Sequence, residues 1–168
     1  MKGVTSYKGI SKYYFKILLE EIINLGDLKD KDCTILDFGC GEGRLKDMLG
    51  KKVIGFDIIK ELSDVEDWRN VDFDVIVSNQ VFYSFNEDAL EKLLDEFKNL
   101  DRKITLIVGI SNQSILNNIG KYLLGRKRAH DLTNLKPQEE LNILMRHARL
   151  IKKKNVLGLS KIFLFNIN

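Results

Sequence analysis

The chain has 168 residues, of which 44% are hydrophobic, 30% are charged and only one is a proline, and its formal net charge is +3. This length can bury one sizeable core but not two, which predicts a single domain over residues 1–168. The composition excludes collagen-like and proline-rich disordered chains, and the small net charge does not identify a nucleic-acid or membrane binder.

The first predicted element is an amphipathic helix. Over residues 13–25 apolar side chains recur at three- and four-residue steps, and Gly26 is the expected stop. Glu20 and Glu21 interrupt its most apolar stretch, so we expect an N-terminal helical region over residues 1–30, with no membrane span and no signal peptide. Two cysteines provide neither a disulfide framework nor a four-ligand zinc site, which favours a cytoplasmic location.

Beyond this region, short apolar strands alternate with helices. Strands are expected at residues 34–38, 52–57, 71–79 and 103–110. Helices are expected at residues 44–49, 87–100, 111–124 and 137–147. Strands at 150–156 and 162–167 close the chain without a helix between them, so the last strand should run antiparallel. The alternation predicts an α/β fold whose mainly parallel sheet is covered on both faces.

A glycine-rich loop follows the first strand. In Asp37-Phe38-Gly39-Cys40-Gly41-Glu42-Gly43 the alternate glycines let the backbone pass close to a ligand. Asp57, at the end of the next strand, is placed to accept hydrogen bonds from ribose hydroxyls. The dinucleotide fingerprint fails because its third glycine position falls on Arg44, and Asp37 would repel a pyrophosphate but attract a cation. These residues favour a cationic, adenosine-containing cofactor over NAD.

The segment Ile35-Leu36-Asp37-Phe38-Gly39-Cys40-Gly41-Glu42-Gly43 resembles the first motif of class I S-adenosylmethionine-dependent methyltransferases, of the type that methylates small molecules. The resemblance extends to residues 53–57, as the ribose-binding strand, and to residues 73–81, as the fourth-strand motif. It implies a Rossmann-like three-layer sandwich with a seven-stranded, mostly parallel sheet and an antiparallel last strand. Too few residues lie between Asp57 and Asp74, so the second helix and third strand should be shortened or lost.

The resemblance also implies S-adenosyl-L-methionine as cofactor and a role for individual residues. The loop glycines would lie along the methionine moiety, Asp37 would help to hold its amine, Asp57 would take the ribose hydroxyls and Ile58 would touch the adenine. The cofactor-binding residues expected in this way are Asp37, Gly39, Cys40, Gly41, Gly43, Asp57, Ile58, Asp64 and Asn79. Cys40 is expected to be a small packing residue rather than a nucleophile.

Two interpretations of residues 63–68 stay open. In the family an acid at this place often contacts the adenine amino group, and both Asp64 and Asp67 are candidates. Alternatively both are solvated loop acids, and Trp68 packs under the shortened edge of the sheet.

The substrate side is less specific. Ser84 stands where many relatives that methylate small molecules have a histidine, so a base must come from elsewhere or be unnecessary. Residues 111–137 correspond to a substrate-covering insertion in the family, and their basic stretch around His130 suits an acidic, partly apolar acceptor. We expect His130 and Tyr83 to be catalytic, with His130 as base. The alternative is a surface or capping histidine and a core tyrosine.

The expected function is methyl transfer to an oxygen, with nitrogen less favoured, of a small and acidic molecule such as a sugar, lipid or quinone precursor. An RNA or protein methyltransferase is one alternative, and a non-catalytic cofactor-binding partner subunit is the other. The RNA alternative is favoured by a second basic cluster, which comprises Arg146, His147, Arg149, Lys152, Lys153 and Lys154. Neither a metal site nor an oligomeric state is predicted.

Overall fold

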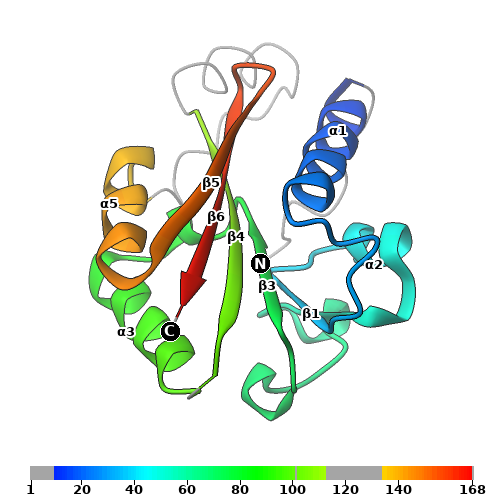
Figure 1. The fold of residues 1–168 in the computed structure, drawn as a ribbon, viewed down its shortest axis with the longest axis horizontal. Helices are drawn as coiled ribbons and strands as arrows, with labels where there is room; N and C mark the ends of the chain where they lie inside the picture. The colour runs from blue at the N-terminus through cyan, green and yellow to red at the C-terminus, as the bar shows by residue number, and fades with distance from the viewer. Residues whose placement is uncertain (1–9, 101, 113–133, 168) are drawn as a thin grey trace.

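A computed structural model describes residues 10–100, 102–112 and 134–167, and its centre is a six-stranded sheet (Figure 1). The strands are β1 (Ile35–Phe38), β2 (Val53–Phe56), β3 (Val75–Asn79), β4 (Ile104–Ser111), β5 (Arg149–Val156) and β6 (Ser160–Ile167), in the spatial order β2-β1-β3-β4-β6-β5. β1 pairs in parallel with β2 and β3, and β3 pairs in parallel with β4. β6 is antiparallel to both β4 and β5, so the expected direction of the last strand is confirmed.

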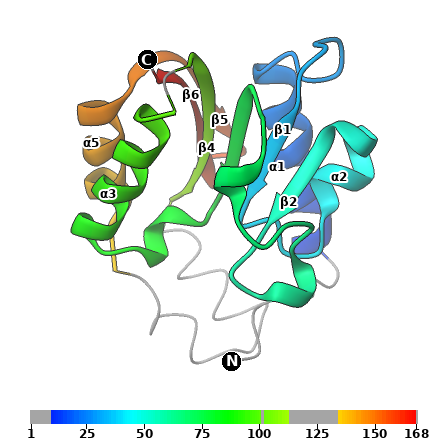
Figure 2. The same ribbon diagram turned by 90° about the horizontal axis from the view of Figure 1, so that it is seen from below.

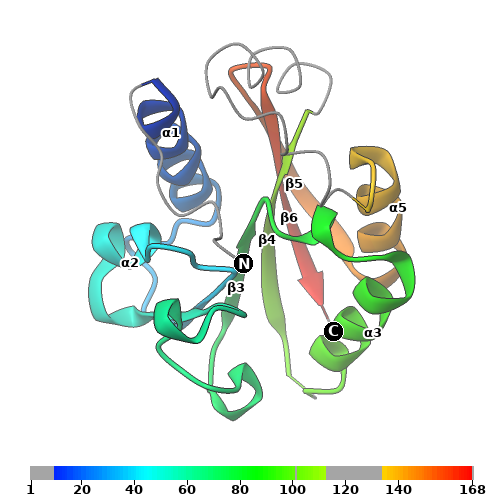
Figure 3. The ribbon, with the colours of Figure 1, turned by 180° about the vertical axis from the view of Figure 1, so that it is seen from behind.

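Helices cover both faces of this sheet. They are α1 (Ile10–Leu25), α2 (Arg44–Leu49), α3 (Glu87–Lys98) and α5 (Pro137–His147). Figure 2 shows α1 and α2 on one face and α3 and α5 on the other, and the view from behind shows the same division (Figure 3). A separate hydrophobic cluster fills the space on each face, which confirms the three-layer α/β sandwich. Among the described residues, no helix has the length and apolar character needed to cross a membrane.

Each predicted helix that falls on described residues is present at nearly the expected bounds. α5 begins at Pro137, where a missing N–H costs nothing, and α3 begins after Asn86, whose side chain accepts the N–H of Ala89 at 2.8 Å. Most of the predicted helix 111–124 and of the proposed insertion 111–137, including His130, lies outside the described residues.

The sheet has one strand fewer than the seven implied by the resemblance, and the difference falls between Asp57 and Asp74. The described chain there forms only the short 3-10 turns η2 (Lys60–Leu62) and η3 (Trp68–Asn70), so β2 is an edge strand. Asp64 replaces part of the missing pairing. Its backbone N–H donates to the carbonyl of Gly55 at 2.9 Å, and its carboxylate accepts the N–H of Gly55 at 2.7 Å. Both backbone groups of Gly55 are thus satisfied without a neighbouring strand.

Trp68 packs under this shortened edge, as one of the two interpretations expected. Its indole is 2% exposed and makes edge-on contacts with Phe38 and Phe97. The rings connect the short segment after β2 to the core beneath α3, which compensates for apolar contacts that a third strand would have made.

Candidate functional site

The carboxyl ends of β1, β2 and β3 meet in a cavity of about 650 Å³, which we call the strand-end cavity. Its size lies within the range of ~300–1,000 Å³ that is usual for ligand pockets. β1 lies between β2 and β3, so the chain reverses its direction across the sheet here, and ligands of open α/β sheets bind at this point. The cavity is lined by eight of the residues expected from the sequence, namely Asp37, Gly39, Cys40, Gly41, Asp57, Ile58, Asn79 and Tyr83.

The glycine loop is fastened to the end of β2. The N–H groups of Gly39 and Cys40 both donate to the carbonyl of Phe56, at 2.7 and 3.1 Å. Gly39 has a φ of +80°, and a Cβ placed on it would lie 2.3 Å from Cγ2 of Val81. Both the backbone angle and the close approach of Val81 therefore require glycine at this position.

Asp57 holds the loop from the other side. Its carboxylate accepts the N–H of Gly41 through Oδ2 and the N–H of Ile59 through Oδ1, both at 3.0 Å. Its own N–H donates to Oγ of Ser63 at 3.1 Å. Each carboxylate oxygen has a second acceptor direction, so the side chain can hold the loop and still accept hydrogen bonds from a ligand in the cavity.

Asp37 is a buried acid at the base of the cavity. Its side chain is 6% exposed, and burial raises its pKa to about 7, with a further contribution from the negative charges of Asp57 and Asp64. No described cation or hydrogen-bond donor offsets this effect. Asp37 and Asp57, which both line the cavity, make this end of it favourable for a positively charged ligand.

Cys40 lies in the same loop but its thiol is not activated. Burial raises the pKa of this thiol to about 12, and Asp37 and Asp57 add to the shift. The thiol donates to the carbonyl of Leu62 at 3.4 Å. A thiol that stays protonated is a poor nucleophile, which supports the packing role expected for Cys40.

Asp64 and Gly43 face a smaller pocket of about 270 Å³ behind the loop rather than the strand-end cavity. Lys46 donates to Oδ1 of Asp64 at 2.7 Å and lowers the pKa of this carboxyl, while Oδ2 accepts the N–H of Gly55. Asp67, the other candidate, accepts the N–H of Arg69 at 3.0 Å and lines neither pocket. An adenine contact by Asp64 stays a prediction.

Two polar residues follow the end of β3. Oδ1 of Asn79 is buried without a hydrogen-bond partner in the described chain, and it faces Gly109, where a Cβ would lie 2.3 Å away. Gln80 has a φ of +57° and its side chain donates to Oγ of Ser160 at 3.2 Å. Ser160 in turn shares a hydrogen bond of 2.5 Å with the hydroxyl of Tyr14, so α1, β6 and the end of β3 are held together beside the cavity.

Tyr83 lies in the 3-10 turn η4 (Phe82–Ser84), and its backbone carbonyl accepts the N–H groups of Asn134 and Leu135 at 2.9 and 3.1 Å. Burial raises the pKa of its phenol, and the negative charge of Glu140 raises it further. The structure thus places Tyr83 in the strand-end cavity, whereas the proposed catalytic partner His130 lies outside the described residues.

Sequence reasoning missed several lining residues that come from other elements. Phe15 and Leu19 reach the cavity from α1, Phe85 and Asn86 reach it from between η4 and α3, and Asn134 reaches it from just before α5. The spacing of apolar residues in the predicted helix 13–25 identified an apolar face, but it did not indicate which residues of that face line the cavity.

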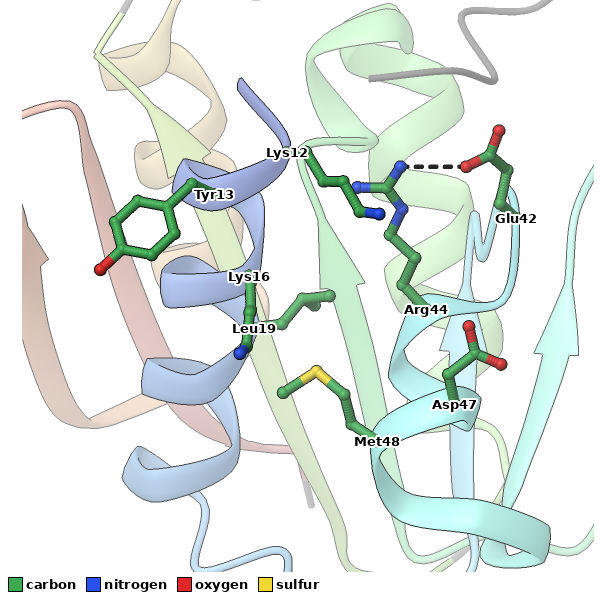
Figure 4. Close-up of a pocket in the computed structure, with 8 residues that line it drawn as sticks. All are labelled: Lys12, Tyr13, Lys16, Leu19, Glu42, Arg44, Asp47 and Met48. Atoms are coloured by element: carbon green, nitrogen blue, oxygen red, sulfur yellow. Dashed lines mark hydrogen bonds and ion pairs between the residues drawn. The ribbon is translucent and has the colours of Figure 1, made fainter. Parts of the chain in front are cut away.

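A second cavity of about 570 Å³ lies between α1 and α2, and we call it the helix groove (Figure 4). It shares Leu19, Glu42 and Arg44 with the strand-end cavity, so the two spaces adjoin. Lys12 and Lys16 line it from α1, and Arg44 pairs with Glu42 at 3.0 Å. Figure 4 shows Lys12 extending from α1 toward α2. The remaining lining residues are Tyr13, Asp47 and Met48.

The second basic cluster is largely engaged within the fold. Arg146 pairs with Glu87 and Glu91 of α3 at 2.7 and 2.5 Å. On β5, Lys154 pairs with Glu21, and Lys152 lies 3.9 Å from Asp27. Over the described parts of the chain, no group of three or more His, Cys, Asp or Glu side chains is arranged to hold a metal ion.

A family model described as a methyltransferase domain matches residues 10–148. None of the curated proteins searched matches this sequence.

Several solved methyltransferase structures resemble the fold. Magnesium protoporphyrin IX methyltransferase from Synechocystis PCC 6803, solved with bound SAH, is 14% identical with a TM-score of 0.61, over 99% of this chain and 90% of that one. The N-methyltransferase NodS from Bradyrhizobium japonicum WM9, also with SAH, is 12% identical with a TM-score of 0.62, over 92% and 87%. The small RNA methyltransferase HEN1 is 20% identical with a TM-score of 0.62, over 100% of this chain but 26% of that one. At these identities the likenesses show the fold alone.

Proposed function

The chain belongs to the methyltransferase domain family, and we propose that it transfers a methyl group to an oxygen of a small, acidic molecule. The family model spans residues 10–148, so the chain is a class I enzyme that uses S-adenosylmethionine. The acceptor, the methylated atom and the residue roles that follow are part of the proposal, as are the single domain and the cytoplasmic location.

The residues of the strand-end cavity fit this cofactor. Asp37 is buried without a described partner, and a positively charged ligand would supply one. Asp57 has acceptor directions for ribose hydroxyls, and the loop between Gly39 and Gly41 leaves its backbone open to the cavity. Ile58 is 90% exposed although it is apolar, as expected of a side chain that an adenine ring covers when bound.

When bound, the cofactor would supply an electrophilic methyl group on a sulfonium, from which a neutral thioether leaves. The work left to the protein is to hold the acceptor oxygen in line with this group and to exclude water. A carboxylate or phosphate oxygen needs no base at neutral pH, whereas a hydroxyl must lose a proton. Tyr83, Ser84 and Asn134 line the cavity beyond the end of β3. The Ser84 hydroxyl donates to the carbonyl of Val81 and the Asn134 amide donates to that of Ser84, which leaves the phenol of Tyr83 and the second amide hydrogen of Asn134 as donors that would orient the acceptor oxygen.

The observation that supports an acidic acceptor is the position of the helix groove. It adjoins the strand-end cavity and brings Lys12, Lys16 and Arg44 to one space, beside the apolar Leu19 and Met48. Glu42 and Asp47 also line the groove, and Glu42 pairs with Arg44, so the three cations exceed the carboxylates by one positive charge. An anionic group of the acceptor would be attracted by this excess, which Lys12 and Lys16 supply, while its apolar part contacted Leu19 and Met48.

RNA is the second candidate acceptor, because β5 presents exposed lysines at the edge of the sheet. It is less favoured, since Lys152 and Lys154 lie against carboxylates of the α1 region and have less charge available for phosphates. An RNA acceptor would show binding that weakens steeply as salt rises.

The proposal is tested with purified protein, methyl-labelled S-adenosylmethionine and pairs of small acceptors that differ only in an acid or its neutral amide. We expect methylation of the acids to be faster, and Lys12→Ala with Lys16→Ala to raise KM for the acid with little change in cofactor affinity. Lys103→Ala is the matched control, because Lys103 is exposed just before β4, at the amino end of that strand. Label transfer to RNA but to no small acid would contradict the proposal.

A further inference from the structure

Three polar side chains meet where α1 packs on the sheet, beside a hydrophobic cluster that holds Leu18 and Ile22 of the same helix. The hydroxyl of Tyr14 lies 2.5 Å from Oγ of Ser160, and Nε2 of Gln80 donates to the same Oγ at 3.2 Å. Tyr14 is 7% exposed and Ser160 is fully buried. We call these three residues the α1 anchor, because they join α1 to β6 and to the residue that follows β3.

The rest of the contact between α1 and the sheet constrains the position of the helix less. Leu18 and Ile22 bury apolar surface, and this burial is non-directional, so it changes little when a helix slides or turns slightly. Lys154 pairs with Glu21 at the edge of the contact, but an exposed pair contributes little. A buried hydroxyl, in contrast, loses its partner when the helix moves, which costs free energy. The α1 anchor therefore distinguishes one position of α1 from its neighbours.

α1 brings side chains to both cavities on either side of Tyr14 in the sequence. Phe15 and Leu19 line the strand-end cavity, and Lys12, Lys16 and Leu19 line the helix groove (Figure 4). Successive residues rise by about 1.5 Å along a helix and turn about its axis, so a shift by one residue would redirect both lysines. The position of α1 thus decides where the positive charges of the groove lie.

At its other end the α1 anchor reaches the wall of the strand-end cavity. Gln80 lines this cavity and has a φ of +57°, an uncommon backbone conformation that persists where surrounding contacts hold it. Its backbone N–H donates to the carbonyl of Gly109 at 2.8 Å, and its side chain donates to Ser160. Ser160 is therefore bonded to a helix on one side and to the cavity wall on the other.

We propose that the α1 anchor fixes the position of α1 and thereby sets the preference of the enzyme for acidic acceptors, with Tyr14 and Ser160 as positioning residues. This inference rests on the proposed function. Neither Tyr14 nor Ser160 lines the strand-end cavity or the helix groove, so both act through the residues that α1 presents there, above all Lys12 and Lys16. Burial raises the pKa of the Tyr14 phenol, which stays protonated at neutral pH and can donate to Ser160.

The two hydroxyls are not equivalent. Tyr14→Phe leaves Ser160 bonded to Gln80, whereas Ser160→Ala removes a partner from both of the other residues. We therefore expect Ser160→Ala to have the larger effect. The double variant should lose little more than Ser160→Ala alone, because the two substitutions remove the same hydrogen bond.

The first test needs no acceptor. Hydrogen–deuterium exchange, read by mass spectrometry, compares α1 with α5 in the wild type, Tyr14→Phe and Ser160→Ala. We expect the backbone of α1 to exchange about 3- to 10-fold faster in both variants, with α5 unchanged. Thr105→Val is the matched control, because Thr105 lies at the amino end of β4, whereas Ser160 pairs with Ser111 at its carboxyl end. Unchanged exchange in α1 would show that apolar contacts alone hold the helix and would overturn the inference.

The second test uses the pairs of small acids and their neutral amides. We expect Tyr14→Phe to raise KM for the acid by about 5- to 10-fold, while kcat and KM for the amide change by less than about twofold. The amide is the less sensitive acceptor because it carries no charge for Lys12 and Lys16 to attract.

Ile143→Val is the control for a purely structural effect. Ile143 is buried in the hydrophobic cluster on the opposite face of the sheet from α1, and shortening it lowers stability by leaving a small cavity. We expect this variant to keep the wild-type preference for the acid. An equal loss of preference in Ile143→Val and Tyr14→Phe would assign the effect to general destabilisation and would contradict a positioning role.

These outcomes separate the two proposals. Faster exchange of α1 with an unchanged preference for the acid would mean that the α1 anchor holds the helix without selecting the acceptor, which would overturn this inference but leave the proposed methylation of acids intact. Absence of any methylated small acid would remove the proposed acceptor class and the preference with it, and the exchange of α1 would still decide whether the anchor fixes the helix. If Ser160→Ala does not fold, Tyr14→Phe, which removes a single oxygen atom, decides both tests.

Discussion

The carboxylate of Asp57 accepts the backbone N–H of Gly41 at 3.0 Å, so a single side chain joins the glycine loop to the end of β2. Ile59 donates to the other oxygen of the same carboxylate, also at 3.0 Å. The group proposed to bind the ribose therefore also shapes the loop proposed to bind the methionine. A ligand bound by Asp57 or by the glycine loop therefore contacts a group whose position depends on the other one.

Asp57→Ala should weaken the binding of S-adenosylmethionine by about 10- to 100-fold, since hydrogen bonds to a charged group contribute roughly 1.5–3 kcal/mol. The loss has two sources, the ribose contact and the looser loop, and Asp57→Asn, which keeps one acceptor oxygen, should lose less. Isothermal titration calorimetry measures both affinities. Asp67→Ala is the control, because Asp67 caps a turn and lines neither pocket. Unchanged affinity in Asp57→Ala would contradict the ribose contact.

Asp37 should make cofactor binding depend on pH. Its pKa is raised from 3.8 to about 7, so the folded protein binds this proton more tightly than the unfolded chain, and stability falls as pH rises from about 4 to about 7. A cationic ligand favours the ionised form. Affinity should therefore increase as pH rises toward 7, with protons released on binding, and Asp37→Asn should abolish both effects.

Calorimetry at pH 6.5, in buffers with different ionisation enthalpies, counts the protons released. Binding isolates Asp37 better than stability does, because Glu140 has its own raised pKa and adds to the pH dependence of unfolding. Proton release that persists in Asp37→Asn would assign the effect to another group.

Gly39 and Gly41 allow a matched comparison within one loop. Both have positive φ, but a Cβ on Gly39 would collide with Val81 at 2.3 Å, whereas a Cβ on Gly41 would meet nothing within 4 Å. Gly39→Ala should therefore reduce stability by more than Gly41→Ala, whose cost is the strained backbone of about 1 kcal/mol. Val81→Ala should rescue part of the Gly39→Ala loss. Urea unfolding gives the free energy of unfolding of Gly39→Ala, Gly41→Ala, Val81→Ala and the double variant of Gly39 and Val81. Equal losses for the two glycine variants would exclude the collision with Val81 as the cause.

Elements that are specified by a continuous stretch of sequence were predicted well. The helix predicted at 137–147 coincides with α5. The glycine loop follows the end of β1 and Asp57 follows the end of β2, as predicted, because alternating β and α segments leave few ways to arrange a parallel sheet. The shortened segment after Asp57 was also predicted, by counting residues.

What could not be predicted depends on contacts between distant segments. No pattern indicates that Asp64 pairs with both backbone groups of Gly55, or that Phe15 of α1 reaches the strand-end cavity. Glu140 left one signal, an acid on the apolar stripe of a predicted helix, but its relation to Tyr83 needs the fold. The acceptor side was the harder part because its residues come from several elements rather than one motif.

Asp64 offers a test of how the fold tolerates its missing strand. Its carboxylate serves both the N–H of Gly55, at 2.7 Å, and Lys46, at 2.7 Å, and the two can be separated. Lys46→Ala removes only an exposed ion pair and should cost little. Asp64→Ala also leaves the N–H of Gly55 without its partner at the sheet edge, while the Gly55 carbonyl keeps the backbone N–H of residue 64, and should cost roughly 1 kcal/mol more. The lowered pKa of Asp64 adds stability that is present above its unfolded value and is lost as pH falls below about 4. Urea unfolding of the two variants at pH 7 and pH 3 measures both effects. Equal losses in Lys46→Ala and Asp64→Ala at pH 7 would mean that the ion pair, and not the bond to Gly55, substitutes for the strand.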